Sequence, residues 1–317
     1  MRQFELENKT TRDAFGAAVL ELAKEDPTVI GIGADTTSNL GMKQMAKEMP
    51  NRVYNVGIAE QNMMGIAAGM AATGFRVFGG SFAPFICMRS LEQFRTFIAY
   101  PHLNVVMAGG MGGLGAANEG VTHQCPEDVA IMRTIAGNVV VAPADTSSTR
   151  AVVLALGRHD GPAYVRLGKT AFHKVFDESY HFEIGKANVL EEGSDVTLIS
   201  CGAALHRALQ AADVLRGEGI EATVLDCTCI KPLDEQAVVA AAAKTGCVVT
   251  VEDSTIMGAL GGAVAEVLSE QLPTPLKRVG IRDVFTESGD MDSLMDKYGL
   301  SVSDITAAAK EVIAKKR

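Results

Sequence analysis

The stretch that decides the fold is Asn55-Val56-Gly57-Ile58-Ala59-Glu60-Gln61-Asn62-Met63. A strand is predicted at 53–56, Gly57 marks a turn, and a helix is predicted at 60–73. That helix is rich in small and apolar residues, so we expect it to be buried. Glu60 would then stand at the carboxyl end of a strand, where open α/β sheets bind their ligands.

Outward from this stretch, short β-branched runs alternate with longer helical segments. Further strands are predicted at 29–32, 76–78, 105–108, 139–142 and 163–166. Further helices are predicted at 11–24, 90–100, 126–135 and 146–158. The alternation is typical of βαβ units, so it predicts an α/β fold with a doubly wound parallel sheet.

The pattern breaks after residue 168 and then resumes, which predicts two domains. Residues 1–170 form the first, 171–189 a linker with a β-hairpin, and 190–317 a second, smaller α/β domain. In the second domain we expect strands at 196–200, 222–226, 248–252 and 277–280. Helices are expected at 203–218, 235–244 and 261–271.

Composition excludes several classes of function. The net charge of −9 argues against nucleic-acid binding and against binding to anionic membranes. No run reaches the roughly 20 apolar residues of a membrane helix, and the first residues lack the apolar core of a secretory signal. The 6 cysteines have no paired C-x-x-C spacing, which argues against a thiolate zinc site. We expect reduced thiols in a cytoplasmic protein.

Four segments could carry chemistry. Glu60 suits acid/base work, or it simply favours a helix N-terminus. Phe82 and Phe85 could stack on a flat heteroaromatic ring, or belong to the core. Gly110, Gly112 and Gly115 satisfy G-x-G-x-x-G, but another glycine follows too soon for a dinucleotide fingerprint. His123 follows in a loop, where it could carry a proton.

Together these segments resemble the transketolase family, and in particular the separate C-terminal subunit of split transketolases. The matching segments lie in order along most of the chain: Thr11-Arg12-Asp13-Ala14-Phe15-Gly16, Gly33-Ala34-Asp35, Ser38-Asn39-Leu40, residues 55–62, Ser81-Phe82-x-x-Phe85, Glu119-Gly120-x-Thr122-His123-Gln124, residues 161–168, Ser288-Gly289 and Tyr298-Gly299-Leu300. The resemblance implies a pyrimidine-binding domain of the thiamine-diphosphate type, followed by a transketolase C-terminal domain.

The resemblance also implies roles for named residues around thiamine diphosphate. Glu60 matches the glutamate that hydrogen-bonds N1′ of the aminopyrimidine. Phe82 and Phe85 would flank that ring, while Asp35 and Ile58 would lie near the cofactor. The cofactor supplies the electron sink for transfer of a two-carbon ketol unit from a ketose to an aldose, and the protein supplies orientation.

Six positions are expected to bind the sugar, and three of them depart from the family pattern. His123 would contact the donor hydroxyls and take part in catalysis, while Arg12 and Ser38 would bind a distal phosphate. Glu119 replaces a family aspartate. Met111 stands where a phosphate-binding histidine is frequent, and Lys169 replaces an arginine, which removes a bidentate contact. An unusual ketose or a different acidic group is therefore expected.

Half of a transketolase is missing from this sequence. The family's G-D-G motif and downstream asparagine, which hold Mg²⁺ and the diphosphate, are absent, and we assign no metal ligand here. A diphosphate needs Mg²⁺ and backbone donors. A partner subunit carrying the N-terminal half is therefore expected to hold Mg²⁺, in an α2β2 assembly with sites between chains.

Two rival functions remain open at this stage. The β subunit of a 2-oxo acid dehydrogenase E1 component would share the fold, the cofactor and Glu60. A noncatalytic module could instead bind a nucleotide through the Gly110 loop.

Overall fold

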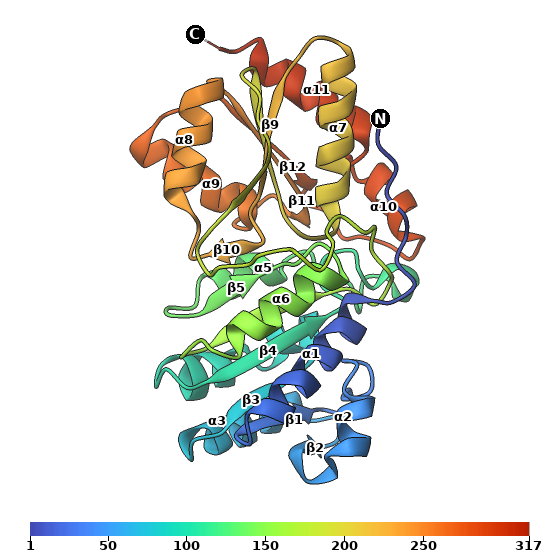
Figure 1. Ribbon diagram of the computed structural model, residues 1–317, viewed down its shortest axis with the longest axis vertical. Coiled ribbons are helices and arrows are strands. Elements are labelled where there is room, and N and C mark those ends of the chain that lie inside the picture. The colour runs from blue at the N-terminus through green and yellow to red at the C-terminus, as the bar shows by residue number, and fades with distance from the viewer. Residues whose placement is uncertain (317) are drawn as a thin grey trace.

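Two α/β units lie one above the other along the long axis of the molecule (Figure 1). The computed structural model describes residues 1–316; Arg317, the last residue of the predicted second domain, lies outside the described residues. Both units are built on largely parallel sheets, as the alternating pattern predicted.

The first unit has a seven-stranded sheet in the described residues, in the order β10-β5-β6-β4-β3-β1-β2. All neighbours pair in parallel except β10 with β5. The strands are β1 (Val29–Gly33), β2 (Val53–Asn55), β3 (Arg76–Phe82), β4 (Val105–Gly110), β5 (Val139–Val141), β6 (Ala163–Leu167) and β10 (Cys229–Lys231). Every residue of β1 and β4 is buried, as expected of parallel strands covered on both faces.

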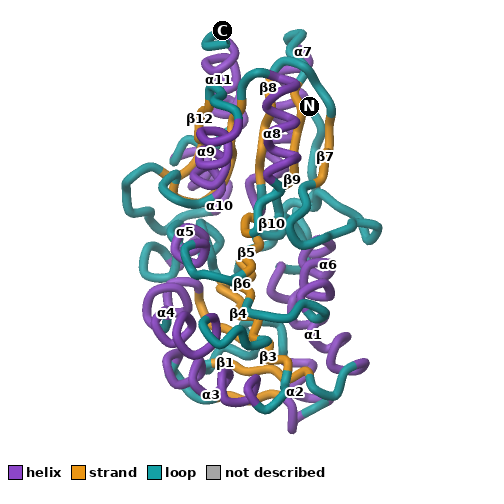
Figure 2. Tube along the Cα trace, turned by 90° about the vertical axis from the view of Figure 1, so that its left-hand side faces the viewer, coloured by secondary structure: helices purple, strands orange, loops and turns teal. Residues whose placement is uncertain are grey.

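Helices cover both faces of this sheet. On one face lie α1 (Thr11–Glu25) and α6 (Thr146–Leu156), and on the other lie α3 (Glu60–Ala72), α4 (Leu91–Gln93) and α5 (Asp128–Arg133) (Figure 2). The short α2 (Lys43–Glu48) lies near β2 at the end of the sheet. Residues 1–170 therefore supply most of a doubly wound unit, in agreement with the predicted fold class.

Over its described residues, the second unit has a five-stranded sheet in the order β12-β11-β8-β9-β7. Its strands are β7 (Asn188–Glu191), β8 (Val196–Ser200), β9 (Ala222–Asp226), β11 (Val248–Thr255) and β12 (Leu276–Ile281). Its helices are α7 (Leu205–Gly217), α8 (Glu235–Thr245), α9 (Leu260–Gln271), α10 (Met291–Lys297) and α11 (Val302–Ile313). Helices α8 and α9 cover one face, and α7 and α11 cover the other (Figure 1).

Two local predictions were wrong. The helix expected at 90–100 is interrupted, because π-helical turns at Phe85–Arg89 and Phe94–Ala99 flank the short α4. The linker forms no hairpin: β7 pairs with β9 of the second unit instead of with a neighbouring linker strand. The linker backbone is held by a side chain, since the Asp145 carboxylate accepts hydrogen bonds from Val175 N and Phe176 N at 2.8 and 2.6 Å.

The contacts that join the units in the described residues were not predicted from the sequence. Strand β10 leaves the second unit to pair with β5. The N-terminal segment runs along the second unit before α1 (Figure 1), where Arg2 forms ion pairs with Asp213 and Glu191. Between the two sheets, the buried Arg166 of β6 pairs with Asp128 of the first unit. Its Nη1 also lies 2.9 Å from the carboxylate of Asp253 on β11 of the second unit.

The described residues contain no helix that is both long and apolar enough to cross a bilayer.

Candidate active site

The candidate site lies where the carboxyl ends of β1, β2, β3 and β4 meet. Gly33 is in register with Gly80 and with Asn55, and Phe82 is in register with Gly110. The loops that follow these strands therefore leave the sheet at one edge, which is where parallel sheets place their ligand sites.

Glu60 is a buried carboxylate at this edge. It begins α3, and its residue is only 3% exposed. Ser81 Oγ donates a hydrogen bond to Glu60 Oε1 at 3.2 Å, and Arg89 Nη1 donates to Oε2 at 3.0 Å. These partners come from other elements, so the carboxylate is aimed across the sheet edge and does not cap its own helix. A buried carboxyl that has hydrogen-bond partners can hold or accept a proton at a fixed position.

Sequence reasoning missed Arg89. Its guanidinium pairs with Glu60 and also lies over the Phe85 ring, 4.0 Å from the ring centroid. The π-helical turn Phe85–Arg89 aims this side chain back toward the sheet, and such turns are frequent at functional sites. The sequence feature that could have indicated Arg89 is a single cation directly after the apolar run Phe85-Ile86-Cys87-Met88.

Three aromatic rings gather beside Glu60 and Arg89. The Phe82 and Phe85 centroids are 5.8 Å apart, and His123 lies 5.4 Å from Phe82 and 5.9 Å from Phe85. All three residues are partly exposed, so their rings are open to a ligand. His123 Nδ1 lies 3.0 Å from the Thr122 hydroxyl. The structure thus brings the predicted aromatic pair and the predicted histidine together.

Asp35, Ser38 and Ile58 are exposed at the same strand ends. Asp35 has a left-handed backbone (φ 60°) and is tied to Asn55 through reciprocal hydrogen bonds of 2.9 and 3.1 Å. Ile58 is 77% exposed, which is unusual for a large apolar residue. These residues rim the site and leave its centre to Glu60 and the rings.

Arg12 lies partly buried along the end of β4. A Cβ on Gly110 would stand 3.6 Å from Arg12 Cδ, which shows how closely the side chain follows the strand. Its Nε is buried without a hydrogen-bond partner, and burial lowers the pKa of Arg12. The part of the chain that the structure describes offers this guanidinium no salt bridge, since the nearby Glu119 pairs with Lys169. An incompletely paired cation at a sheet edge suits an anionic ligand.

Met111, which was predicted to bind the sugar, is buried. It has a left-handed backbone (φ 65°), and only 3% of the residue is exposed, so it offers a ligand little surface. The loop then turns into the short 3₁₀ segment Ala117–Glu119, where a dinucleotide fingerprint requires a full helix. The Gly110 loop therefore lacks the helix N-terminus that would bind a pyrophosphate.

The two units match known domain families. Residues 7–174 match the transketolase pyrimidine-binding domain, and residues 185–305 match the transketolase C-terminal domain. The chain belongs to the transketolase family, as the subunit of split transketolases that carries these two domains.

Two relatives and one solved structure cover the chain almost completely. A 6-deoxy-6-sulfo-D-fructose transketolase subunit from Clostridium sp. strain MSTE9 is 42% identical, over 99% of this chain and 98% of the relative. One subunit of an apulose-4-phosphate transketolase from Phocaeicola vulgatus is 38% identical, over 96% of this chain and 97% of the relative. The structure of a split gene transketolase, an inactive beta4 tetramer, aligns with a TM-score of 0.91 and 42% identity, covering 97% of this chain and 99% of that one.

These matches favour transketolase over the dehydrogenase β subunit and the nucleotide-binding module. The family also implies dependence on thiamine diphosphate.

Proposed function

We propose that this chain supplies the aminopyrimidine side of a thiamine-diphosphate site that transfers a two-carbon ketol unit between sugars. The observation that carries the proposal is Glu60, a carboxylate 3% exposed that points across the sheet edge beside three aromatic rings. The residues fit an aminopyrimidine: a carboxylate faces its ring nitrogen, and Phe82 and Phe85 offer apolar faces.

When bound, thiamine diphosphate supplies a thiazolium carbon that takes up the ketol unit as an electron sink. The chain's own residues then have distinct tasks. Glu60 would accept or donate a proton at the pyrimidine nitrogen, and Ser81 and Arg89 fix the direction of its carboxylate. His123 is placed to donate hydrogen bonds to the donor hydroxyls, because its ring stands beside both phenylalanines. Asp35 and Ile58 would lie near the cofactor.

A partner subunit is expected to complete the site by holding Mg²⁺ and the diphosphate. In the described residues, three metal-ligating side chains gather at one place only, on the linker and second unit. Apolar residues beside the site are exposed: Ile58 by 77%, Met88 by 49% and Val121 by 45%. Such apolar surface marks an interface. The inactive beta4 tetramer of the related split gene transketolase supports the need for a second kind of subunit, and we propose an α2β2 assembly.

For the substrate, we propose a ketose with an anionic group at its far end, bound by Arg12 with Ser38 beside it. The unpartnered Nε of Arg12 supports an anion there. Lys169 keeps the charge of an arginine but lacks its bidentate fork, and it is already paired with Glu119. Met111 is apolar and offers the ligand no charge. The relatives named above act on a sulfonated sugar and on a sugar phosphate, both of which end in an anion.

The first experiment is reconstitution with a subunit that carries the N-terminal half, assayed for ketol transfer with thiamine diphosphate and Mg²⁺. Glu60→Gln should lower kcat by at least about a hundredfold, the scale of general acid–base catalysis. Glu92→Gln is the matched control, because Glu92 is exposed on the neighbouring α4. Equal loss in both variants, or decarboxylation of a 2-oxo acid in place of ketol transfer, would refute the proposal.

The second experiment compares sugars that differ only at the far end. Arg12→Gln should raise KM for sulfonated and phosphorylated ketoses by about tenfold or more and leave uncharged ketoses nearly unchanged. A similar rise for charged and uncharged sugars would show that Arg12 supports the fold and does not bind the anion.

A further inference from the structure

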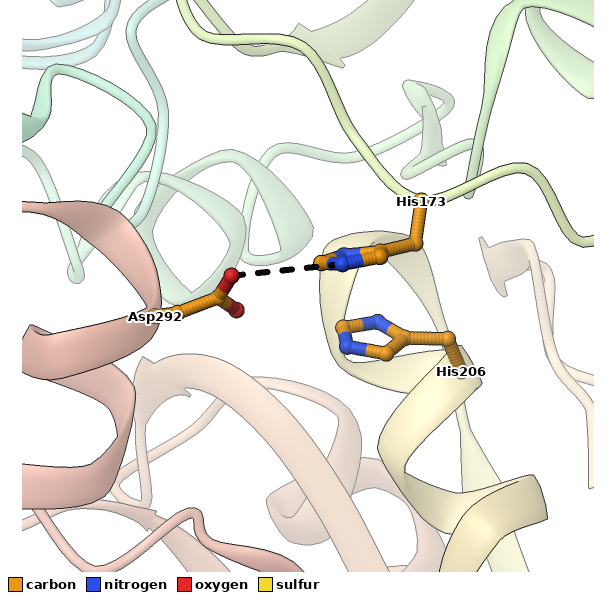
Figure 3. Close-up of side chains that lie close together, drawn as sticks. All are labelled: His173, His206 and Asp292. Atoms are coloured by element: carbon orange, nitrogen blue, oxygen red, sulfur yellow. Dashed lines mark ion pairs between the residues drawn. The ribbon is translucent and has the colours of Figure 1, made fainter. Parts of the chain in front are cut away.

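A second group of ligand-type side chains lies outside the candidate active site, where the linker meets the second unit. His173 comes from the linker, His206 from α7 and Asp292 from α10 (Figure 3). One ligand atom from each lies within 4.8 Å of the others. The ketol-transfer site uses none of these residues.

The two imidazole rings are stacked, with their centroids 4.2 Å apart and an interplanar angle of 26°. Figure 3 shows the Asp292 carboxylate at the edge of this stack. His173 Nε2 lies 3.9 Å from Asp292 Oδ2. Two histidines and one carboxylate form a donor set that suits first-row divalent cations such as Zn²⁺ and is a poor match for Mg²⁺ or Ca²⁺.

His206 is already held as a metal-binding histidine is held. It is 5% exposed, and its Nδ1 lies 2.8 Å from the Ala203 carbonyl oxygen. A carbonyl oxygen can only accept a hydrogen bond, so Nδ1 carries the proton and donates it, which leaves Nε2 with a free lone pair.

Asp292 is also oriented by a neighbour. Arg207 Nη2 donates to Asp292 Oδ1 at 3.0 Å, which leaves Oδ2 facing His173. Arg207 also pairs with Asp296, so these three charged groups together carry one net negative charge. A cavity of about 420 Å³ borders both histidines and Asp292, and it gives room for a water ligand.

From these contacts we propose that His173, His206 and Asp292 bind a Zn²⁺-class cation, with water completing its coordination. Zinc bonds to nitrogen or oxygen of about 2.1 Å require ligand atoms roughly 3.4 Å apart, so the side chains must close by up to about 1.4 Å. His173 and Asp292 can move that far, because their side chains are 22% and 51% exposed. His206 is the fixed member.

A bound cation would cross-link the linker to α7 and α10 of the second unit. The linker residue His173 forms an isolated bridge with Leu6, and Phe4 packs edge-on against His206 with centroids 6.1 Å apart. The cation therefore sits where the N-terminal segment, the linker, α7 and α10 converge. Lys174 is exposed next to His173, so tryptic cleavage after Lys174 reports on how firmly the linker is held.

The test uses the full chain, stripped with a chelator and titrated with Co²⁺ and then with Zn²⁺. Visible d–d absorption of one bound Co²⁺ per chain is expected, displaced by Zn²⁺. His173→Gln should weaken binding at least tenfold, since loss of even an outer-shell partner costs about 10–100-fold. Zn²⁺ should slow cleavage after Lys174 in the wild type and not in His173→Gln.

His181→Gln is the matched control, because His181 is an exposed histidine of the same linker and lies outside the cluster. It should bind Co²⁺ like the wild type. His206→Ala removes a second proposed ligand, from α7, and should also weaken Co²⁺ binding. Circular dichroism checks that this variant folds. The proposal is overturned if Co²⁺ does not bind the wild type, or if His173→Gln binds it as tightly as His181→Gln does. The six cysteines are the same in every variant, so any Co²⁺ bound to them would not produce a difference between His173→Gln and His181→Gln.

Discussion

The carboxylate of Glu60 and the guanidinium of Arg89 lie 3.0 Å apart, although the Glu60 side chain is 3% exposed and that of Arg89 is 48% exposed. The pair therefore joins a buried acid to a cation that faces solvent and stacks on Phe85. A guanidinium held on both sides in this way restricts the carboxylate to one direction.

Arg89 should act as a positioning residue. In the reconstituted enzyme, Arg89→Met should lower kcat by about tenfold, in the range of one charged hydrogen bond to a buried group. Arg89→Lys should recover part of the rate, because it keeps the charge and loses the planar fork. Steady-state kinetics check this. A rise in KM with unchanged kcat would contradict a role exerted through Glu60.

The buried ion network between the units should be costly to break. Arg166 is 5% exposed and pairs with Asp128 and Asp253, which are both buried. Arg166→Met leaves these two carboxylates without their cation, so the free energy of unfolding should fall by roughly 3–5 kcal/mol. Urea denaturation measures this loss. The control is Arg150→Met, whose half-exposed pair with Glu21 should contribute less than about 1 kcal/mol.

Glu252 should make stability depend on pH. Burial raises the pKa of Glu252 to about 7, partly offset by hydrogen bonds from Leu260 N and Gly261 N at 2.8 and 2.6 Å. A carboxyl whose pKa is higher in the folded state binds a proton more tightly there. Its contribution is therefore full below the ordinary carboxyl pKa and is lost as pH rises toward 7.

This loss has an upper size of roughly 3 kcal/mol. Glu252→Gln should flatten this part of the stability curve, as followed by urea denaturation at a series of pH values. Glu270→Gln should leave the curve unchanged, because Glu270 is exposed near the far end of α9, the helix whose first amides bind Glu252. Buried Asp226 and Asp253 also have raised pKa values and will keep some slope in every variant. An identical curve for Glu252→Gln and wild type would contradict the assignment to Glu252.

Much of the fold could be predicted from the sequence because buried parallel strands are short, apolar and bounded by turns. The segments 29–32 and 196–200 have this pattern, and β1 and β8 lie there. Strand β10 could not be found this way: it has three residues, and its partner β5 lies about ninety residues earlier in the chain. Its pairing follows from how the units pack, which periodicity does not encode.

Some residues of the candidate site could likewise be predicted from the sequence, and others could not. Glu60, Phe82, Phe85 and His123 stand in segments with a recognisable order, and the structure places the rings side by side. Arg89 has no such context, since only the π-helical turn brings it to Glu60. His173 and His206 lie 33 positions apart (206 − 173) and meet only in the folded chain, so their spacing does not reveal the pair.

The pairing of β10 with β5 has a consequence for synthesis of the chain on the ribosome. When residue 170 emerges, β5 still has an open hydrogen-bonding edge, and it stays open until Lys231 has been made. An open edge is a template for another chain. A gene shortened after the linker would therefore yield a protein prone to self-association, and the two units should be inherited, expressed and engineered as one piece.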